Sequence, residues 1–312
     1  MNSSPQSGGK QYRIATIVKV LDRHPWFLRM QAGVQAFAKH TGHDAFVMSA
    51  AKADEHLQEK LIEDVTAQGV DALCIVPVIP QALEMALMRA QAKGIVVISH
   101  EASNLRNIHY DLEAFDNRRY GIHLMDHLAR GIGAAGEYAI FMGWLTSRTH
   151  EEWTKAAIEH QHQTYPNMNL VSKKIEDHED HTIAYQKTLE LLDAYPHLRG
   201  ILTIGMTASM GVGAAIEAQK LKDKVTVLGT GLVSACRTYL RSGALKLLSF
   251  WDPADAGYVM NTLAVMALQK QAVTDGMNLG APGYEQITLK NKVIYGAAWI
   301  DVTYDTMAKY TF

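Results

Sequence analysis

The stretch that decides the fold of this chain is Ile14-Ala-Thr-Ile-Val-Lys-Val-Leu-Asp-Arg-His-Pro-Trp-Phe-Leu-Arg-Met-Gln-Ala-Gly-Val-Gln-Ala-Phe-Ala38. It begins as an apolar strand, passes through a short polar turn, and continues from His24-Pro25-Trp26-Phe27 as an amphipathic helix. Two adjacent aromatic residues at such a turn are poorly placed for a core, because the carboxyl ends of parallel strands face a crevice. They suit a ligand with an apolar face and polar edges, such as a sugar.

The bulk composition is that of a globular protein with more than one core. The chain has 312 residues, of which 48% are hydrophobic and 20% are charged, and its length predicts two domains. The formal net charge of −2 offers no electrostatic footprint for nucleic acid or for an anionic membrane surface. No run approaches eighteen apolar residues, so the sequence predicts no membrane-spanning helix.

Short apolar runs alternate with helical patterns along most of the chain. Strands are predicted at 44–49, 73–77, 95–99 and 108–111, and a second series at 138–142, 170–175, 200–204, 225–228 and 245–250. Strands that are apolar throughout and separated by helices indicate parallel sheets covered on both faces. The two series therefore predict an α/β fold with two Rossmann-like lobes, followed by strand-like runs at 286–289 and 293–295.

Several motifs occur in a characteristic order along the chain. They are Lys19 at the end of the first strand, Tyr195-Pro196 before the strand at Ile201, Phe250-Trp251-Asp252 followed by Gly257, and an aromatic C-terminus. In this order and spacing the chain resembles the periplasmic sugar-binding proteins of ABC importers, which have the type I, ribose-binding fold. The nearest branch contains the autoinducer-2 and rhamnose-binding proteins, and the resemblance runs from about Tyr12 to Phe312.

The resemblance implies two lobes joined by a three-segment hinge, with a ligand bound in the cleft between them. Crossings are expected near 111–114, near 250–253 and within 280–290. The first lobe would then comprise 10–112 and 252–282, the second would comprise 113–251 and 283–312, and residues 1–9 would be a flexible leader. The resemblance further implies a monomeric periplasmic protein whose export signal has been removed, which delivers its ligand to an ABC transporter permease, without cofactor, metal or nucleic acid.

Five candidate ligand contacts fall in the first lobe. His24, Trp26 and Phe27 match the element with which ribose-binding proteins hold a sugar: aromatic faces pack on its C–H groups, and the imidazole exchanges hydrogen bonds. For Phe27 the alternative is that it is the hydrophobic anchor of its helix. Lys19 matches a ligand-binding lysine of the autoinducer-2 branch, although a structural salt bridge is the alternative. Glu101 matches an acidic position that accepts hydrogen bonds from sugar hydroxyls.

The other candidate contacts belong to the second lobe and to the hinge. The family places polar ligand contacts near Arg148, Thr149 and His150, and Arg148 could equally be a solvated charge. Candidates that follow the strands at 200–204 and 245–250 are Met206, Thr207, Trp251 and Asp252.

Differences from the family pattern reduce the number of candidate ligands. Autoinducer-2 proteins carry an Asp-Gln pair where this chain has approximately Thr149-His150, and ribose-binding proteins have an aspartate where Gly229-Thr-Gly231 offers none. Both differences argue against those two ligands. The expected ligand is another monosaccharide or similar polyol, including a deoxy or amino sugar.

Alternative functions have weaker support. There is no Walker lysine, no dinucleotide fingerprint and no Gly-x-Ser-x-Gly elbow, so an enzyme is not expected. His178 and His181, with the acidic residues 177, 179 and 180, are interpreted as a solvated loop and not as a metal site. Cys74 is expected to be a buried, inert thiol. A periplasmic sensor that addresses a membrane receptor, or the effector domain of a lactose-repressor-type regulator, remains open.

Overall fold

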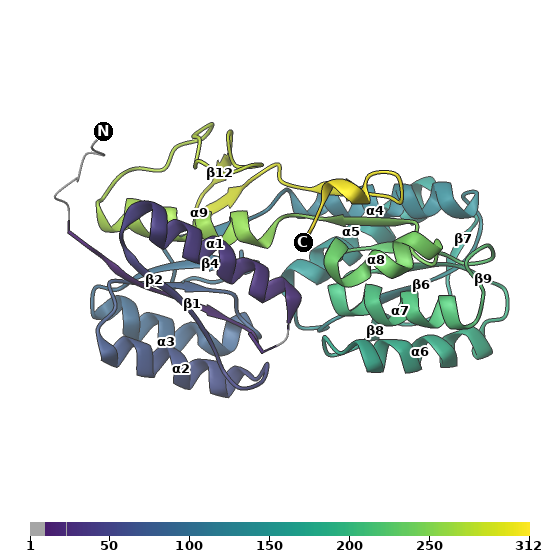
Figure 1. Cartoon of the computed structure of the whole chain (residues 1–312), viewed down its shortest axis with the longest axis horizontal. Helices are drawn as coiled ribbons and strands as arrows, with labels where there is room; N and C mark the ends of the chain where they lie inside the picture. Colours follow the sequence, from purple (N-terminus) through teal and green to yellow (C-terminus); the bar gives the residue numbers. More distant parts are fainter. Residues whose placement is uncertain (1–9, 23) are drawn as a thin grey trace.

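The computed structural model describes residues 10–22 and 24–312, which form two lobes lying side by side along the long axis of the molecule (Figure 1). The leader predicted over 1–9 lies outside the described residues. Each lobe contains a largely parallel sheet with helices on both faces, which confirms the predicted α/β fold. No helix of the described ranges combines the length and the apolar character needed to cross a membrane.

The first lobe is built on a sheet with the strand order β12-β13-β5-β4-β3-β1-β2. Its side chains alternate between two cores: in β1, Ile14 and Val18 face the core that α1 and α9 cover, whereas Ala15 and Ile17 face the core that α2 and α3 cover. Burial on both faces explains why these strands are apolar throughout. The elements are β1 (Arg13–Val18), α1 (Pro25–Thr41), β2 (Asp44–Ser49), α2 (Glu55–Gln68), β3 (Ala72–Ile75), α3 (Pro80–Ala92), β4 (Val96–His100), β5 (Tyr110–Glu113), α9 (Pro253–Leu268), β12 (Thr288–Lys290) and β13 (Val293–Tyr295).

The second lobe has the strand order β14-β11-β10-β9-β6-β7, with β8 also paired to β6. Helices α4 and α5 pack together, and α7 packs against α6 and α8. The strand predicted at 170–175 is broken into β7 and β8, because the backbone bends at Ser172 and Lys173 and the pairing with β6 is interrupted there. The elements are α4 (Asn117–Ile132), β6 (Gly136–Met142), α5 (Arg148–Thr164), β7 (Met168–Leu170), β8 (Ile175–Glu176), α6 (His181–Ala194), β9 (Leu198–Thr203), α7 (Met206–Ala218), β10 (Thr226–Gly229), α8 (Val233–Ser242), β11 (Leu247–Phe250), β14 (Ile300–Val302) and a 3-10 turn (Met307–Lys309).

Three segments connect the lobes: 114–116 between β5 and α4, 251–252 between β11 and α9, and 296–299 between β13 and β14. The third lies later in the chain than the predicted 280–290. The reason is that β13 pairs with β5, and β12 pairs with β13, so the chain through Tyr295 belongs to the first sheet. The prediction that placed residues from 283 onward in the second lobe is therefore wrong for 283–295.

Helix α1, whose first turn carries Trp26 and Phe27, is held tightly against α9. A Cβ atom on Gly33 would lie 1.9 Å from the carbonyl oxygen of Ala254, so only glycine allows the two helices to come this close. Because α9 begins directly after the 251–252 crossing, this contact fixes the first turn of α1 beside the hinge.

Both cysteines that the sequence contains are buried free thiols in the structure. Cys74 lies in β3 of the first sheet, and burial raises the pKa of its thiol far above the ordinary range. The prediction that Cys74 is a buried thiol is confirmed.

Candidate functional site

Residues from both lobes and from the hinge converge at the carboxyl ends of the parallel strands. Some positions directly follow β1, β4, β9, β10 and β11, and the others lie on the connections and helix starts that follow β1, β6, β8 and β9, which is where open α/β sheets place their ligands. They surround a small cavity whose lining comprises Lys19, His24, Trp26, Phe27, Glu101, His150, Trp153, Glu179, Ile204, Gly205, Met206, Thr207, Thr230 and Trp251.

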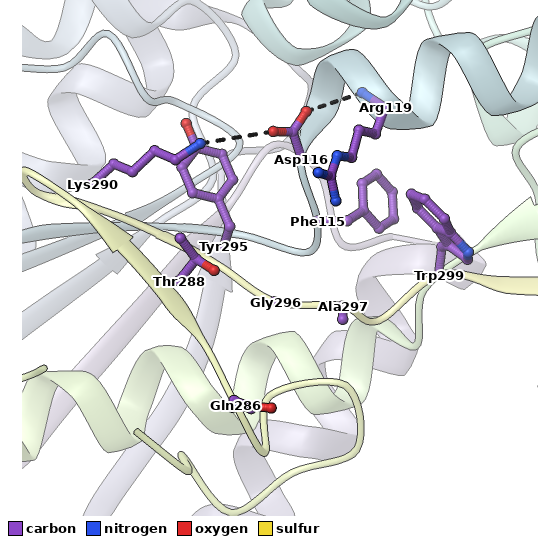
Figure 2. A pocket seen from close by; sticks show the side chains of 10 residues that line it. All are labelled: Phe115, Asp116, Arg119, Gln286, Thr288, Lys290, Tyr295, Gly296, Ala297 and Trp299. Atoms are coloured by element: carbon purple, nitrogen blue, oxygen red, sulfur yellow. Dashed lines mark hydrogen bonds and ion pairs between the residues drawn. The ribbon is translucent and has the colours of Figure 1, made fainter. Parts of the chain in front are cut away.

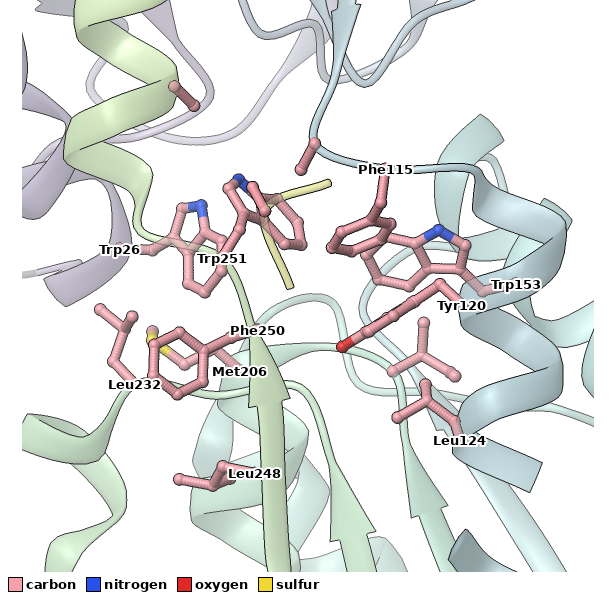
Figure 3. Packing of buried hydrophobic residues seen from close by; sticks show 14 of the residues in the cluster. Trp26, Phe115, Tyr120, Leu124, Trp153, Met206, Leu232, Leu248, Phe250 and Trp251 are labelled. Atoms are coloured by element: carbon pink, nitrogen blue, oxygen red, sulfur yellow. The ribbon is translucent and has the colours of Figure 1, made fainter. Parts of the chain in front are cut away.

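One wall of the cavity is aromatic. The rings of Trp26 and Trp251 meet edge to face with centroids 4.7 Å apart, and Trp251 also contacts Trp153 of the second lobe at 5.7 Å. Phe115 of the first crossing lies 5.4 Å from the Trp251 ring, and Figure 3 shows these rings gathered around the end of β11. Each ring keeps another in place, so the wall offers fixed apolar faces of the kind on which a sugar ring packs.

The cavity lining also contains a buried ion pair between the lobes. Lys19 Nζ of the first lobe lies 3.3 Å from Glu179 Oε1 of the second, and their side chains are only 5% and 12% exposed. His24 Nε2 lies 3.8 Å from the other oxygen of the same carboxylate. Burial alone would raise the pKa of Glu179, but the neighbouring Lys19 ammonium lowers it below its ordinary value. Both partners are therefore charged at neutral pH.

Two histidines in the cavity are neutral. Burial lowers the pKa of His24, and it lowers that of His150, which also faces the Lys19 charge, to about 4. Neutral imidazole offers one hydrogen-bond donor and one acceptor, which matches a hydroxyl group. Among the described residues, the charged groups of the lining are one lysine, Lys19, and two glutamates, Glu101 and Glu179.

Several buried polar atoms of the lining make no hydrogen bond to any residue that the structure describes. They are both ring nitrogens of His24, Nδ1 of His150, Oγ1 of Thr207, Nε1 of Trp251 and Oε2 of Glu179. A buried polar group without a hydrogen-bond partner lowers the stability of the fold by about 1–3 kcal/mol. A group of such atoms in one cavity therefore indicates that a bound molecule supplies their partners. Here these atoms belong to the same cavity lining as Trp26 and Trp251 of the aromatic wall.

Glu179 reaches the cavity through an unusual turn. His178 and Glu179 both adopt left-handed backbone conformations, with φ of 56°, and the Glu179 N–H donates to Asp177 Oδ1 at 2.8 Å. A Cβ atom on Gly143 would lie 2.7 Å from Cγ of Glu179, so the glycine makes room for the carboxylate. Asp177 is fully buried. The prediction of a solvated loop at 177–181 is therefore wrong for these two acidic residues.

Nine of the twelve predicted site residues line the cavity: Lys19, His24, Trp26, Phe27, Glu101, His150, Met206, Thr207 and Trp251. The two open interpretations of Lys19 prove compatible, since it lines the cavity and also forms a salt bridge. Five further lining residues were not predicted. Thr230 and residues 204–205 follow strands β10 and β9, where the strand-end rule could have found them, whereas Trp153 and Glu179 gave no local signal.

Three predicted residues lie outside the lining. Arg148 is 47% exposed and pairs with Glu152 on the same helix at 2.8 Å, as its interpretation as a solvated charge requires. Thr149 is buried next to it in α5. Asp252 caps α9 by accepting from the Ala254 N–H at 2.9 Å, and both of its oxygens accept hydrogen bonds from Arg29, at 2.8 and 2.5 Å.

The cavity is narrow in this conformation. Its volume is about 40 Å³, compared with roughly 300–1,000 Å³ for ordinary small-molecule pockets. A sugar can enter only if the walls separate. Since the walls belong to different lobes joined by three crossings, hinge opening is the motion that the architecture offers.

A larger hollow of about 510 Å³ lies against the first and third crossings (Figure 2). Its polar groups are exposed: Lys290 is 62% and Asp116 38% exposed, and the two lie 3.9 Å apart. It lacks the buried charges of the narrow cavity, and we therefore take the narrow cavity as the candidate site.

Comparison with known proteins places this architecture in a defined class. The periplasmic binding protein domain family matches residues 14–272, and the chain therefore belongs to that family. It is 26% identical to the D-allose-binding periplasmic protein of Escherichia coli (strain K12) over 252 residues, 78% of this chain and 80% of the relative. It is also 26% identical to the D-apiose import binding protein of Paraburkholderia graminis over 212 residues, 65% of each chain.

Solved structures show the same fold at lower identity. LsrB from Clostridium saccharobutylicum in complex with AI-2 superposes with a TM-score of 0.88 at 19% identity, covering 96% of this chain and 100% of that one. An ABC transporter solute-binding protein from Clostridium phytofermentas with bound L-rhamnose has a TM-score of 0.85 at 20% identity, covering 96% and 98%. The type I binding-protein fold, which the sequence resemblance implied, is confirmed.

Proposed function

We propose that this protein captures a neutral monosaccharide or a similar small polyhydroxylated compound in the cavity between its lobes. The observation that carries the proposal is the pairing of an aromatic wall, Trp26 and Trp251, with a buried Lys19–Glu179 ion pair and unpartnered polar atoms. Aromatic faces suit the C–H surface of a sugar ring, and its hydroxyls can both donate to carboxylates and accept from ammonium or indole N–H groups.

The charges of the lining favour a neutral ligand over a charged one. Lys19 is already compensated by Glu179, and both histidines are neutral, so among the lining residues that the structure describes no uncompensated cation faces an acidic sugar. Glu101 is the remaining charged group of the lining, and an ionised carboxylate can accept hydrogen bonds from two adjacent hydroxyls. A cationic amino sugar is the alternative that Glu101 would also accommodate.

The proposed role is delivery of the captured compound to the permease of an ABC transporter in the periplasm. The named relatives among periplasmic and import binding proteins support this part of the proposal, as does a two-lobed form that can present a closed, liganded state. In this role the protein carries out no chemical conversion of its ligand.

A thermal-shift screen with neutral sugars, deoxy sugars, amino sugars and polyols tests the proposal. A ligand present at a thousand times its Kd stabilises the folded state by about 4 kcal/mol, so a cognate sugar should raise the Tm by several degrees. Trp26→Ala should abolish that shift while unfolding cooperatively. The matched control is Tyr304→Ala, which removes an aromatic ring that is 60% exposed and outside the cavity lining. No shift with any compound, together with turnover of one of them, would overturn the proposal.

A further inference from the structure

Two histidines and an aspartate meet on one side of the second lobe, and none of them lines the sugar cavity. His123 and His127 lie one turn apart on α4, and Asp301 lies in β14. His123 Nε2 is 2.9 Å and His127 Nε2 is 3.6 Å from the same oxygen of Asp301, Oδ2. One nitrogen or oxygen atom from each residue lies within 4.8 Å of the others.

Local structure holds the three side chains in this arrangement. Residues four apart on a helix project from the same face, which brings the two imidazoles together with ring centroids 4.5 Å apart. Strand β14 pairs antiparallel with β11, so Asp301 occupies a fixed register position opposite Ser249. The ring of Trp299 stacks on the His123 ring at 5.1 Å and 10°, which restricts the rotation of that imidazole.

We propose that His123, His127 and Asp301 form a binding site for a divalent transition-metal ion such as Zn²⁺. Two imidazole nitrogens and one carboxylate oxygen are a ligand set that this class of ion prefers. With metal–ligand bonds of about 2.0–2.2 Å, the ligand atoms of a tetrahedral site lie about 3.3 Å apart. The two distances to Asp301 Oδ2, 2.9 and 3.6 Å, lie on either side of that value.

The side chains are accessible enough for an ion to enter. They are 21%, 24% and 32% exposed for His123, His127 and Asp301, so solvent can reach the site and supply the remaining ligand as water. A purely structural ion pair needs only one histidine per carboxylate. The neighbouring pair of His160 Nε2 and Asp126 Oδ1, 2.6 Å apart, has that simpler composition and provides a matched comparison.

Zinc titration of the untagged full chain by isothermal calorimetry tests the proposal. The wild type should bind one Zn²⁺, and His123→Ala, His127→Ala and Asp301→Asn should each weaken binding by at least about tenfold. His160→Ala should leave the constant unchanged. Sugar binding should survive in all four variants, which shows that they are folded and separates this test from that of the proposed function.

A measurement on the wild type and the His160→Ala control covers the case in which a variant of His123, His127 or Asp301 fails to fold. In a long-range ¹H–¹⁵N spectrum, stoichiometric Zn²⁺ should shift the ring nitrogens of two histidines, and His160→Ala should remove neither shifted signal. The proposal is overturned if the wild type binds no Zn²⁺ with a Kd below about 1 mM. It is equally overturned if the His123→Ala and His127→Ala variants retain the wild-type constant.

Discussion

Lys19 and Glu179 belong to different lobes and lie 160 residues apart in sequence, yet their side chains form an ion pair of 3.3 Å inside the candidate site. Because each lobe supplies one charge, the pair exists only when the lobes are close together. The two groups therefore stabilise the closed arrangement of the lobes, and they also supply charged hydrogen-bonding groups to the cavity. Removing one charge leaves the other uncompensated in a buried place, which is the costly way to break such a pair.

Glu179→Gln is expected to weaken sugar binding by at least about tenfold, because a buried charge that loses its partner costs more than the 1.4 kcal/mol to which tenfold corresponds. The measurement is calorimetric titration with whichever sugar the thermal-shift screen identifies. Wild-type affinity in this variant would show that the pair contributes neither to closure nor to binding.

The matched control for that variant is Arg148→Gln. It also removes one partner of an ion pair, but the Arg148–Glu152 pair is exposed and joins residues four apart on one helix. Such pairs contribute about 0.5 kcal/mol or less, so affinity should stay within about twofold of the wild type. A large loss of sugar affinity in this variant would show that Arg148 contacts the ligand, as the family resemblance implies.

Gly143→Ala tests the position of the Glu179 carboxylate without changing any charge. The φ of Gly143 lies outside the left-handed range that favours glycine, so alanine is tolerated by the backbone itself. Its methyl group would lie 2.7 Å from Cγ of Glu179 and must displace that side chain from the position in which it pairs with Lys19. We expect weaker sugar binding, by about tenfold, with a smaller loss of thermal stability. Unchanged affinity would mean that the Glu179 side chain adjusts without cost.

Much of the site could be predicted from sequence because it follows one rule of the fold. Apolar strands such as β1 and β4 are visible in the chain, and the residues after them, Lys19 and Glu101, must lie at the crevice. Adjacent aromatic residues at such a turn, here Trp26 and Phe27, mark the place where an apolar ligand face is needed.

The parts that could not be predicted depend on distant partners. The turn that carries Glu179 has the composition of a solvated loop, and its burial depends on distant groups such as Lys19 and on the missing side chain of Gly143. Likewise β12, β13 and β14 have three residues each, and their sheet is decided by pairing with β5 and β11, not by their own pattern. The third crossing was misplaced for that reason.

Asp252, a predicted ligand contact, makes structural contacts in this conformation. Its carboxylate binds the Arg29 guanidinium through two hydrogen bonds, and that guanidinium lies 4.1 Å from the ring centroid of Phe312. Phe312 is bound to the second lobe, since its backbone oxygen accepts a hydrogen bond from the Ser234 N–H at 3.0 Å. Arg29 thus joins the first lobe both to the crossing at 251–252 and to the second lobe.

A double-mutant cycle with Arg29→Gln and Asp252→Asn should give a coupling free energy of about 1–2 kcal/mol in urea unfolding, as charge-assisted hydrogen bonds between partly buried groups do. Sugar affinity should fall by similar, modest factors in the two single variants, since both act through the same pair. If Asp252→Asn alone abolishes binding while Arg29→Gln does not affect it, Asp252 contacts the ligand directly, as the resemblance to the family implies.

The buried Asp177 gives stability a predictable dependence on pH. Burial raises the pKa of its carboxyl group to about 8 in the folded state, from about 3.9 in an unfolded chain. Between these values the folded state holds a proton that the unfolded state has lost. The free energy of unfolding therefore falls as pH rises through this window, by about 1.4 kcal/mol per pH unit for this group, and levels off above the folded pKa.

Asp177→Asn removes that titration and keeps an oxygen able to accept from the Glu179 N–H, the bond that Asp177 Oδ1 makes at 2.8 Å. Urea unfolding of both proteins at pH 4.5, 6, 7 and 8.5 measures the effect as a difference, so that other buried carboxyl groups cancel. We expect the variant to gain steadily on the wild type from pH 4.5 to 8.5, by a few kcal/mol in total. A difference that stays constant with pH would show that Asp177 is ionised in the folded protein throughout, and that burial does not hold its proton.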